Sequence, residues 1–238
     1  MNNWHEIWGK RTVSAGKTAS SYPLGELIKL DGFDTPLGLM SEKDWRDYYY
    51  HSFRDRYKIG GSESVFEIGC GAGALLYLFN EANCAIGGLD YSENLLKLSQ
   101  VNFSEQGDGF LCVEASCTPV RPTYDIVISN HVIHYFPSLA YARTVIRLGL
   151  EKARKCLVIH GIPDAAYRVD SEAFRRGMHS EEEYAKKYTG LSILYFERDW
   201  FRVLASKAGA KIRFYDHQMP HFPQNRFRYD IILEKITS

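Results

Sequence analysis

Three glycines at alternate positions, Gly69, Gly71 and Gly73, follow a short apolar stretch at residues 64–68. Glycine allows the backbone to turn tightly and leaves no side chain between the turn and a ligand. The helix that we predict next, at residues 72–82, presents unpaired N–H groups at the same point. A strand that turns through glycines into a helix is typical of nucleotide-binding α/β sheets. Taken by itself, this turn also fits close packing or an NAD site.

Short apolar strands alternate with helices along most of the chain after this turn. Such alternation predicts a parallel, doubly wound sheet. The last two strands have no helix between them, so they should form a hairpin whose final strand runs antiparallel to its neighbours. We therefore predict an α/β fold: a Rossmann-like, seven-stranded, mostly parallel sheet with an antiparallel last strand, helices on both faces and an N-terminal helical cap. The predicted strands are 64–68, 85–89, 109–113, 124–129, 155–160, 211–216 and 228–235, and the helices of the sheet are 72–82, 92–103, 138–152 and 198–208.

Two segments are additions to the predicted sheet. Residues 1–60 should form a helical cap, because Ser41 is a good N-cap with Asp44 three residues later and aromatic residues then recur at helical spacing. Residues 161–196 form a long connection, with one helix predicted at 171–188, and connections of this length are usually functional. The domains predicted are thus a cap or lid at 1–60 and a catalytic domain at 61–238 that contains the insertion 161–196.

Two carboxylates sharpen the interpretation of the glycine turn. Glu67 precedes the first glycine by two residues, and Asp90 ends the second strand about 20 residues later, where it can accept hydrogen bonds from a ribose diol. The GxGxG spacing with these two acids resembles the class I methyltransferases that depend on S-adenosylmethionine (AdoMet). The resemblance covers about residues 64–235, including the terminal hairpin, which NAD-binding Rossmann sheets lack. It implies that the chain is an enzyme that binds AdoMet and releases S-adenosylhomocysteine.

The same resemblance implies roles for individual residues at the cofactor. Glu67, Gly69 and Gly71 would line the methionine and ribose end, and Asp90 would bind both ribose hydroxyls. The remaining implied contacts are with the adenine and with the transferring methyl group: Tyr91 against the adenine ring, Glu114 and Ala115 at the adenine amino group, and Asn130 near the methionine and the methyl. Glu114 stands where the family often has aspartate, so the structural alternative for it is a solvated loop carboxylate.

Several histidines follow the predicted strands at the carboxyl edge, where ligands bind in open α/β sheets. A hydroxyl acceptor needs a general base, and histidine titrates nearest to neutrality. We select His134 and His160 as candidates; alternatively, His134 packs against its helix and His160 hydrogen-bonds the insertion. The other groups expected at this edge are His131, Asp164, His217, His221 and Arg226. No metal site is predicted, since His131 and His134 have no carboxylate or cysteine clustered with them.

Composition restricts the partners that we expect. Lys plus Arg and Asp plus Glu number 29 each, so no global field favours a polyanion. The five cysteines contain no CxxC pair, and no apolar stretch approaches the length of a membrane span. We therefore expect a cytoplasmic monomer or homodimer with a small-molecule acceptor, without nucleic acid or membrane as partner.

The acceptor is predicted from a further resemblance. The N-terminal tryptophans and the segment 195–201 look similar to methyltransferases of bacterial surface-polysaccharide or secondary-metabolite pathways. That implies O-methylation of a sugar or nucleotide-sugar, with Trp4, Trp8, Trp45, Tyr48 and Tyr49 as stacking surfaces and with Arg226 and Arg228 at a phosphate. The alternatives are an RNA methyltransferase that uses the basic, aromatic segment 217–228, a non-catalytic AdoMet-binding module, and NAD-dependent chemistry.

Overall fold

A computed structural model describes residues 4–12, 21–35 and 38–236. Parts of the predicted cap, including residues 13–20, lie outside the described residues. Within the described ranges, no helix has the length and apolar character that a membrane span requires.

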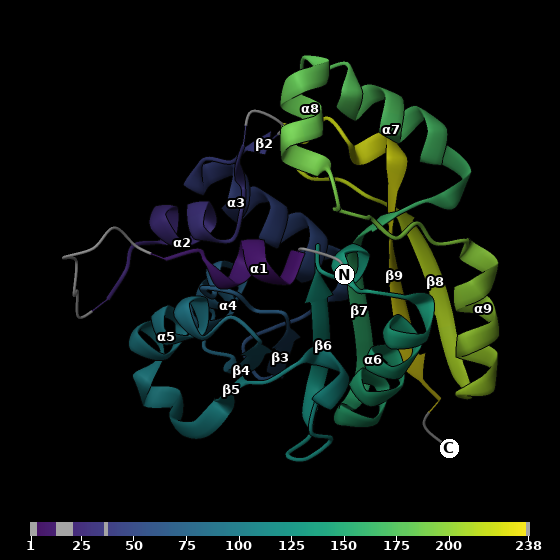
Figure 1. The fold of residues 1–238 in the computed structure, drawn as a ribbon. Coiled ribbons are helices and arrows are strands. Elements are labelled where there is room, and N and C mark those ends of the chain that lie inside the picture. The colour runs from purple at the N-terminus through teal and green to yellow at the C-terminus, as the bar shows by residue number, and fades with distance from the viewer. Residues whose placement is uncertain (1–3, 13–20, 36–37, 237–238) are drawn as a thin grey trace.

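The centre of the molecule is a seven-stranded sheet in the order β5-β4-β3-β6-β7-β9-β8 (Figure 1). Strand β9 pairs antiparallel with both β7 and β8, and the other neighbouring pairs are parallel. The predicted Rossmann-like sheet with an antiparallel last strand is thus confirmed. The strands are β3 (Ser64–Ile68), β4 (Ala85–Asp90), β5 (Phe110–Cys112), β6 (Tyr124–Asn130), β7 (Ala153–Pro163), β8 (Ala210–Asp216) and β9 (Arg228–Lys235).

Helices cover both faces of the sheet, because alternate residues of each buried strand point to opposite faces. In β6, Ile126 and Ile128 join the core under α4 and α5, whereas Val127 joins the core under α6 and α9. Figure 1 shows the sheet between these two pairs of helices. Their bounds are α4 (Ala74–Glu81), α5 (Glu93–Asn102), α6 (Leu139–Lys152) and α9 (Arg198–Lys207).

The N-terminal segment packs on the α4 side of the sheet. The N-cap prediction is confirmed: the Ser41 hydroxyl accepts from the Asp44 N–H at 3.1 Å and Asp44 accepts from the Ser41 N–H at 3.1 Å. Trp45 donates its indole N–H to the carbonyl of Ala74 at 3.0 Å, which fixes the cap to the start of α4. The elements are α1 (Trp4–Gly9), α2 (Leu24–Leu30), β1 (Asp34–Thr35), β2 (Gly38–Leu39), α3 (Glu42–Tyr49) and the π-helical turn η1 (Tyr50–Asp55).

The insertion after β7 differs from its prediction. In place of one helix at 171–188 it contains α7 (Arg168–Arg176) and α8 (Glu181–Tyr188), at the top of Figure 1. The break has local causes, since Gly177 follows α7 and Ser180 forms a capping box with Glu183 at the start of α8. The short 3-10 turns are η2 (Ser104–Gly109), η3 (Ala115–Cys117), η4 (Ile133–Tyr135), η5 (Ala165–Tyr167) and η6 (Asn225–Phe227).

Candidate functional site

A cavity of about 870 Å³ opens at the carboxyl ends of β3, β4 and β6. The glycine turn and Asp90 meet in its wall: the N–H of Gly71 donates to Asp90 Oδ2 at 3.0 Å, and the N–H of Ser92 donates to Oδ1 at 2.8 Å. Ligand pockets usually measure roughly 300–1,000 Å³, so this cavity has room for a cofactor and a small second ligand. The two features singled out in the sequence therefore belong to one site.

The turn needs glycine for two separate reasons. Gly69 has φ 78° and Gly71 has φ 54°, in the left-handed region that side chains with a Cβ rarely adopt. A Cβ at Gly71 would also collide with the carboxylate of Asp31, and one at Gly69 would lie 2.6 Å from Val132 Cγ2. The backbone consequently approaches the cavity without a side chain in between.

Asp31 is a pocket residue that the sequence analysis missed. Its carboxylate accepts from the N–H of Ala72 at 2.6 Å and from the N–H of Ala74 at 2.9 Å, so a residue of the cap satisfies the start of α4. Burial raises the pKa of Asp31 to about 7, against the lowering effect of the two N–H donors. An Asp-Gly pair after a short helix is ordinary turn sequence, and nothing in the pattern indicated this long-range contact.

Glu67, at the end of β3, also lines the cavity. Its side chain is buried, and its Oε2 has no hydrogen-bond partner among the residues that the structure describes. Burial raises the pKa of Glu67 well above its usual range, and the neighbouring Asp31 and Asp90 raise it further. A buried carboxyl oxygen without a partner calls for a hydrogen-bond donor or a positive group from a ligand.

The residues predicted at the adenine lie together under α1. Tyr91, Glu114 and Ala115 line the cavity. The ring of His5 stacks on Tyr91 at 4.1 Å between centroids, and His5 Nε2 lies 3.0 Å from Glu114 Oε1. Glu114 Oε2 also accepts from the hydroxyl of Tyr141 at 2.8 Å. Glu114 is therefore held in the wall of the site and is not a free loop carboxylate.

Asn130 ends β6 and lines the far part of the cavity. Its Oδ1 accepts from the Tyr48 hydroxyl at 2.8 Å, and the same hydroxyl oxygen lies 2.8 Å from His160 Nδ1. Because Tyr48 has a single proton to donate, His160 Nδ1–H must donate to Tyr48, and its Nε2 then accepts from Tyr57 at 2.9 Å. This chain of hydrogen bonds fixes the Asn130 amide with its oxygen turned toward the cap.

The two candidate bases occupy different surroundings. His134 lines the cavity and is buried, and its Nδ1 has no hydrogen-bond partner among the described residues. His160 is fully buried outside the cavity lining, with both ring nitrogens engaged by tyrosines. Burial lowers the pKa of His160 to about 3, so the ring is neutral. Its position suits holding Tyr48 and Tyr57 rather than meeting a ligand.

The other groups expected at the carboxyl edge also separate. His131 lines the cavity beside His134. Asp164 pairs with Arg198 at 3.1 Å, and His221 lies at the surface 3.5 Å from Asp44. Arg226 packs over Phe174 and Phe227 outside the cavity lining, while Arg228 lines it.

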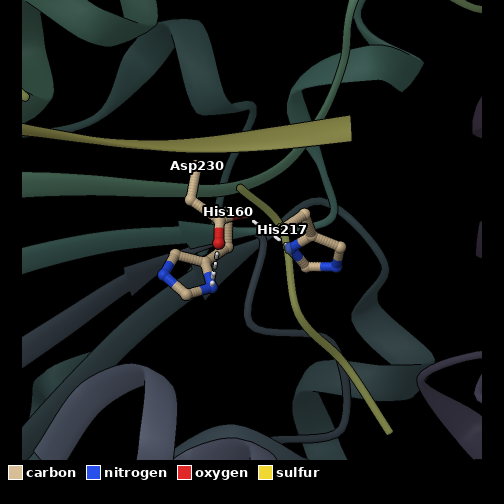
Figure 2. A group of neighbouring side chains, drawn as sticks. All are labelled: His160, His217 and Asp230. Carbon is tan, nitrogen blue, oxygen red and sulfur yellow. Dashed lines mark hydrogen bonds and ion pairs between the residues drawn. The ribbon is translucent and has the colours of Figure 1, made fainter. Parts of the chain in front are cut away.

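A buried group of three residues lies behind the site. His160, His217 and Asp230 place their ligand-type atoms within 4.8 Å of one another, and Figure 2 shows the Asp230 carboxylate pointing between the two rings. The His217 Nδ1–H donates to Asp230 Oδ1 at 2.7 Å, and Arg56 pairs with Oδ2 at 2.9 Å. Arg56 already supplies a positive partner for Asp230, while His217 Nε2 is buried without a hydrogen-bond partner among the described residues.

The strand order and the glycine–aspartate contact define the class I AdoMet-dependent methyltransferase fold. Residues 66–162 match the family model described as a methyltransferase domain. Magnesium protoporphyrin IX methyltransferase (ChlM) from Synechocystis PCC 6803, solved with bound S-adenosylhomocysteine, superposes with a TM-score of 0.55 at 18% identity over 99% of this chain and 93% of that one. DesVI from Streptomyces venezuelae superposes with a TM-score of 0.59 at 11% identity over 82% of this chain and 93% of that one.

A curated relative matches part of the sequence. It is a probable nonribosomal peptide synthetase, CymA, from Salinispora arenicola (strain CNS-205), 26% identical over 153 residues. The match spans 61% of this chain and 2% of that much longer protein. Residues 66–162 thus match a methyltransferase domain, and the chain has the fold of AdoMet-dependent methyltransferases.

Proposed function

We propose that this chain transfers the methyl group of AdoMet to an oxygen of a small organic acceptor. The proposal depends on one observation: the glycine turn and Asp90 are joined in the wall of a cavity whose volume lies within the range of ligand pockets. Glu67, with its unpartnered oxygen, suits the positively charged end of this cofactor. The hydrogen-bond acceptors Glu67 and Asp90 therefore match the positive end of the cofactor and its ribose hydroxyls.

Each cofactor contact is proposed from its place in the wall. Asp90 accepts from the ribose hydroxyls, beside Gly69 and Gly71 at the methionine side, and Asn130 lies toward the reacting methyl. Tyr91, Glu114 and Ala115 hold the adenine. The segments 1–60 and 161–196 act as the cap and the acceptor-side insertion, since residues of both line the same cavity.

AdoMet, when bound, supplies a methyl group that is already activated on a sulfonium sulfur. The protein's task is then alignment and removal of one proton. We assign His134 as the base that takes the proton of the acceptor hydroxyl, because it lines the cavity, is uncharged at neutral pH and has a free ring nitrogen. The acceptor hydroxyl gives its proton to His134 as its oxygen gains the methyl, and S-adenosylhomocysteine is left.

A sugar or nucleotide-sugar is the acceptor class that we favour within this proposal. Aromatic side chains, among them Trp4 and Trp8, line the cavity and suit the faces of a sugar ring. The RNA alternative is weakened, since in the segment 217–228 His217 is buried and Arg226 packs over two phenylalanines.

Calorimetry tests the cofactor and the residue that holds it. S-adenosylhomocysteine should bind the purified protein, and NAD should bind at least tenfold more weakly. Asp90→Ala should lower the affinity for S-adenosylhomocysteine tenfold or more, because the ribose diol loses its acceptor. Exposed Glu93→Gln, at the first residue of α5, serves as the matched control and should bind normally. NAD binding of equal strength would end the proposal. Production of S-adenosylhomocysteine with a panel of sugars and nucleotide-sugars then separates an enzyme from a binding module.

A further inference from the structure

Two arginines lie in the cavity wall beside His134. Arg175 comes from α7 in the insertion and Arg228 begins β9, so they are distant in sequence and converge on one place. Arg175 is only 8% exposed. The two guanidinium groups lie close enough for Arg175 to lower the pKa of Arg228, which burial has already brought down to about 10.

Neither arginine forms an ion pair with an acid among the residues that the structure describes, although Asp230 lies near enough to raise the pKa of Arg228. The Nε atoms of both are buried without a hydrogen-bond partner there, and Arg228 Nη1 donates only to the neutral carbonyl of Gly161, at 2.5 Å. Two partly exposed arginines, by contrast, do form ion pairs: Arg56 with Asp230 and Arg198 with Asp164. A buried charge without a counter-ion is costly, so the missing negative charge is expected from a ligand.

Charge is divided along the cavity. Its carboxylates are Glu6, Asp31, Glu67, Asp90 and Glu114, with Arg11 beside Asp31, while Arg175 and Arg228 lie with His134. Guanidinium groups bind carboxylate and phosphate groups with paired hydrogen bonds. We propose that the acceptor carries an anionic group, a carboxylate or a phosphate, held between Arg175 and Arg228. This inference rests on the proposed function and names the chemical class of its acceptor.

An anion at this place would also change the proposed base. Burial lowers the pKa of His134, and the positive charges of Arg228 and Arg175 lower it further. A negative group between the arginines offsets their field at the imidazole, so His134 becomes a stronger base once an acceptor of the correct charge is bound. The two arginines would thus select for an anionic acceptor in binding and again in proton removal. One residue differs from the sequence prediction: Arg175, and not Arg226, lines the cavity together with Arg228.

Calorimetry on the S-adenosylhomocysteine complex tests the proposed anion site between Arg175 and Arg228. The probes are benzoate, inorganic phosphate and benzamide, which is the neutral match of benzoate. We expect at least one anion to bind saturably and benzamide to bind at least tenfold more weakly than benzoate or not at all. Arg175→Gln and Arg228→Gln should each lower the affinity of the anion that binds by tenfold or more. Arg176→Gln and Arg226→Gln are matched controls, because each is a near neighbour in sequence outside the cavity lining, and both should bind the anion normally.

The outcomes separate this inference from the proposed function. Binding of benzoate alone identifies a carboxylate anchor, and binding of phosphate alone identifies a phosphate anchor. An equal loss of anion affinity in all four variants, equal affinity for benzamide and benzoate, or no anion binding would overturn the proposed anion site. In each of these cases, binding of S-adenosylhomocysteine would still support a methyltransferase. S-adenosylhomocysteine affinity also reports folding of each variant, and Arg175→Gln is decisive because no backbone carbonyl depends on that side chain in the described contacts.

Discussion

The two histidines selected from the sequence have opposite hydrogen-bond surroundings, and substitution should separate them. His134→Gln removes a ring in contact with the cavity, so turnover should fall about 100-fold with S-adenosylhomocysteine affinity preserved. His160→Phe leaves the buried hydroxyls of Tyr48 and Tyr57 without their partner, so the free energy of unfolding should fall by about 2–4 kcal/mol. Steady-state kinetics and urea unfolding measure the two effects. Full turnover in His134→Gln would mean that the base lies elsewhere, with His131 the next group to test.

Sequence reasoning located the strand ends at this site but not the direction of each side chain. His160 was expected beyond the fifth strand, yet β7 continues to Pro163, so His160 lies within the strand and points toward α3 and η1. Asn130, at the end of β6, is paired beside it and lines the cavity. Asp31 could not be found at all, because its contact with α4 joins segments about 40 residues apart and leaves no local pattern.

Helix α1 spans the cofactor side of the cavity and the insertion. Trp4 donates its indole N–H to the carbonyl of Ser192 at 2.7 Å, and its own carbonyl accepts from the Tyr91 hydroxyl at 3.2 Å. A helix of six residues is not stable alone, so these contacts hold it over the cavity. Trp4 therefore links the two additions to the sheet.

We expect Trp4→Ala to speed release of S-adenosylhomocysteine roughly five- to tenfold, since the link to Ser192 and the contact with Tyr135 are both lost. Stopped-flow measurement of dissociation checks the effect. Lys10→Ala, one residue after the same helix and outside the cavity lining, is the control and should release the ligand at the normal rate. An unchanged rate in Trp4→Ala would show that α1 does not cover the bound ligand.

Local signals explain which elements could be predicted. Ser41 and Asp44 predicted the start of α3 because the capping box is built from neighbouring residues. The insertion carried equally local signals, Gly177 and Ser180, but helical periodicity on both sides led to one helix where there are two. The packing of α1 depends on residues far along the chain, so the sequence did not predict its contacts with Ser192 and Tyr91.

In the whole molecule, the mostly parallel sheet with its antiparallel last strand followed from the alternation of strands and helices, while the distribution of charge around the cavity did not follow from the sequence. The net charge is zero, yet most of the acids of the cavity lie with Arg11 at the cofactor side, and Arg175 and Arg228 lie at the other. That separation arises only when the cap supplies Asp31 and the insertion supplies Arg175. Composition therefore indicates that the molecule as a whole carries no net electrostatic field, but it contains no information on the local field in the cavity.

The acidic side of the cavity predicts how cofactor affinity depends on pH. In the free protein, burial raises the pKa of Asp31 to about 7 and also raises the pKa values of Glu67 and Asp90. A ligand that brings hydroxyl donors and a positive amino group favours the carboxylate forms, so it lowers these pKa values and releases protons on binding. Affinity for S-adenosylhomocysteine should therefore rise as the pH is increased from about 5 to about 7.5, as fewer protons remain to be displaced.

Calorimetry in two buffers with different ionisation enthalpies measures the protons released at pH 6.5, where the effect should be clear. Asp31→Asn removes the group whose pKa lies nearest to neutrality, so it should reduce this release, whereas Asp125→Asn, at the opposite end of the sheet, should leave it unchanged. Proton uptake on binding would contradict the prediction. It would mean that the ligand raises the pKa of a group in the site and that its positive charge is met by groups other than Asp31, Glu67 and Asp90.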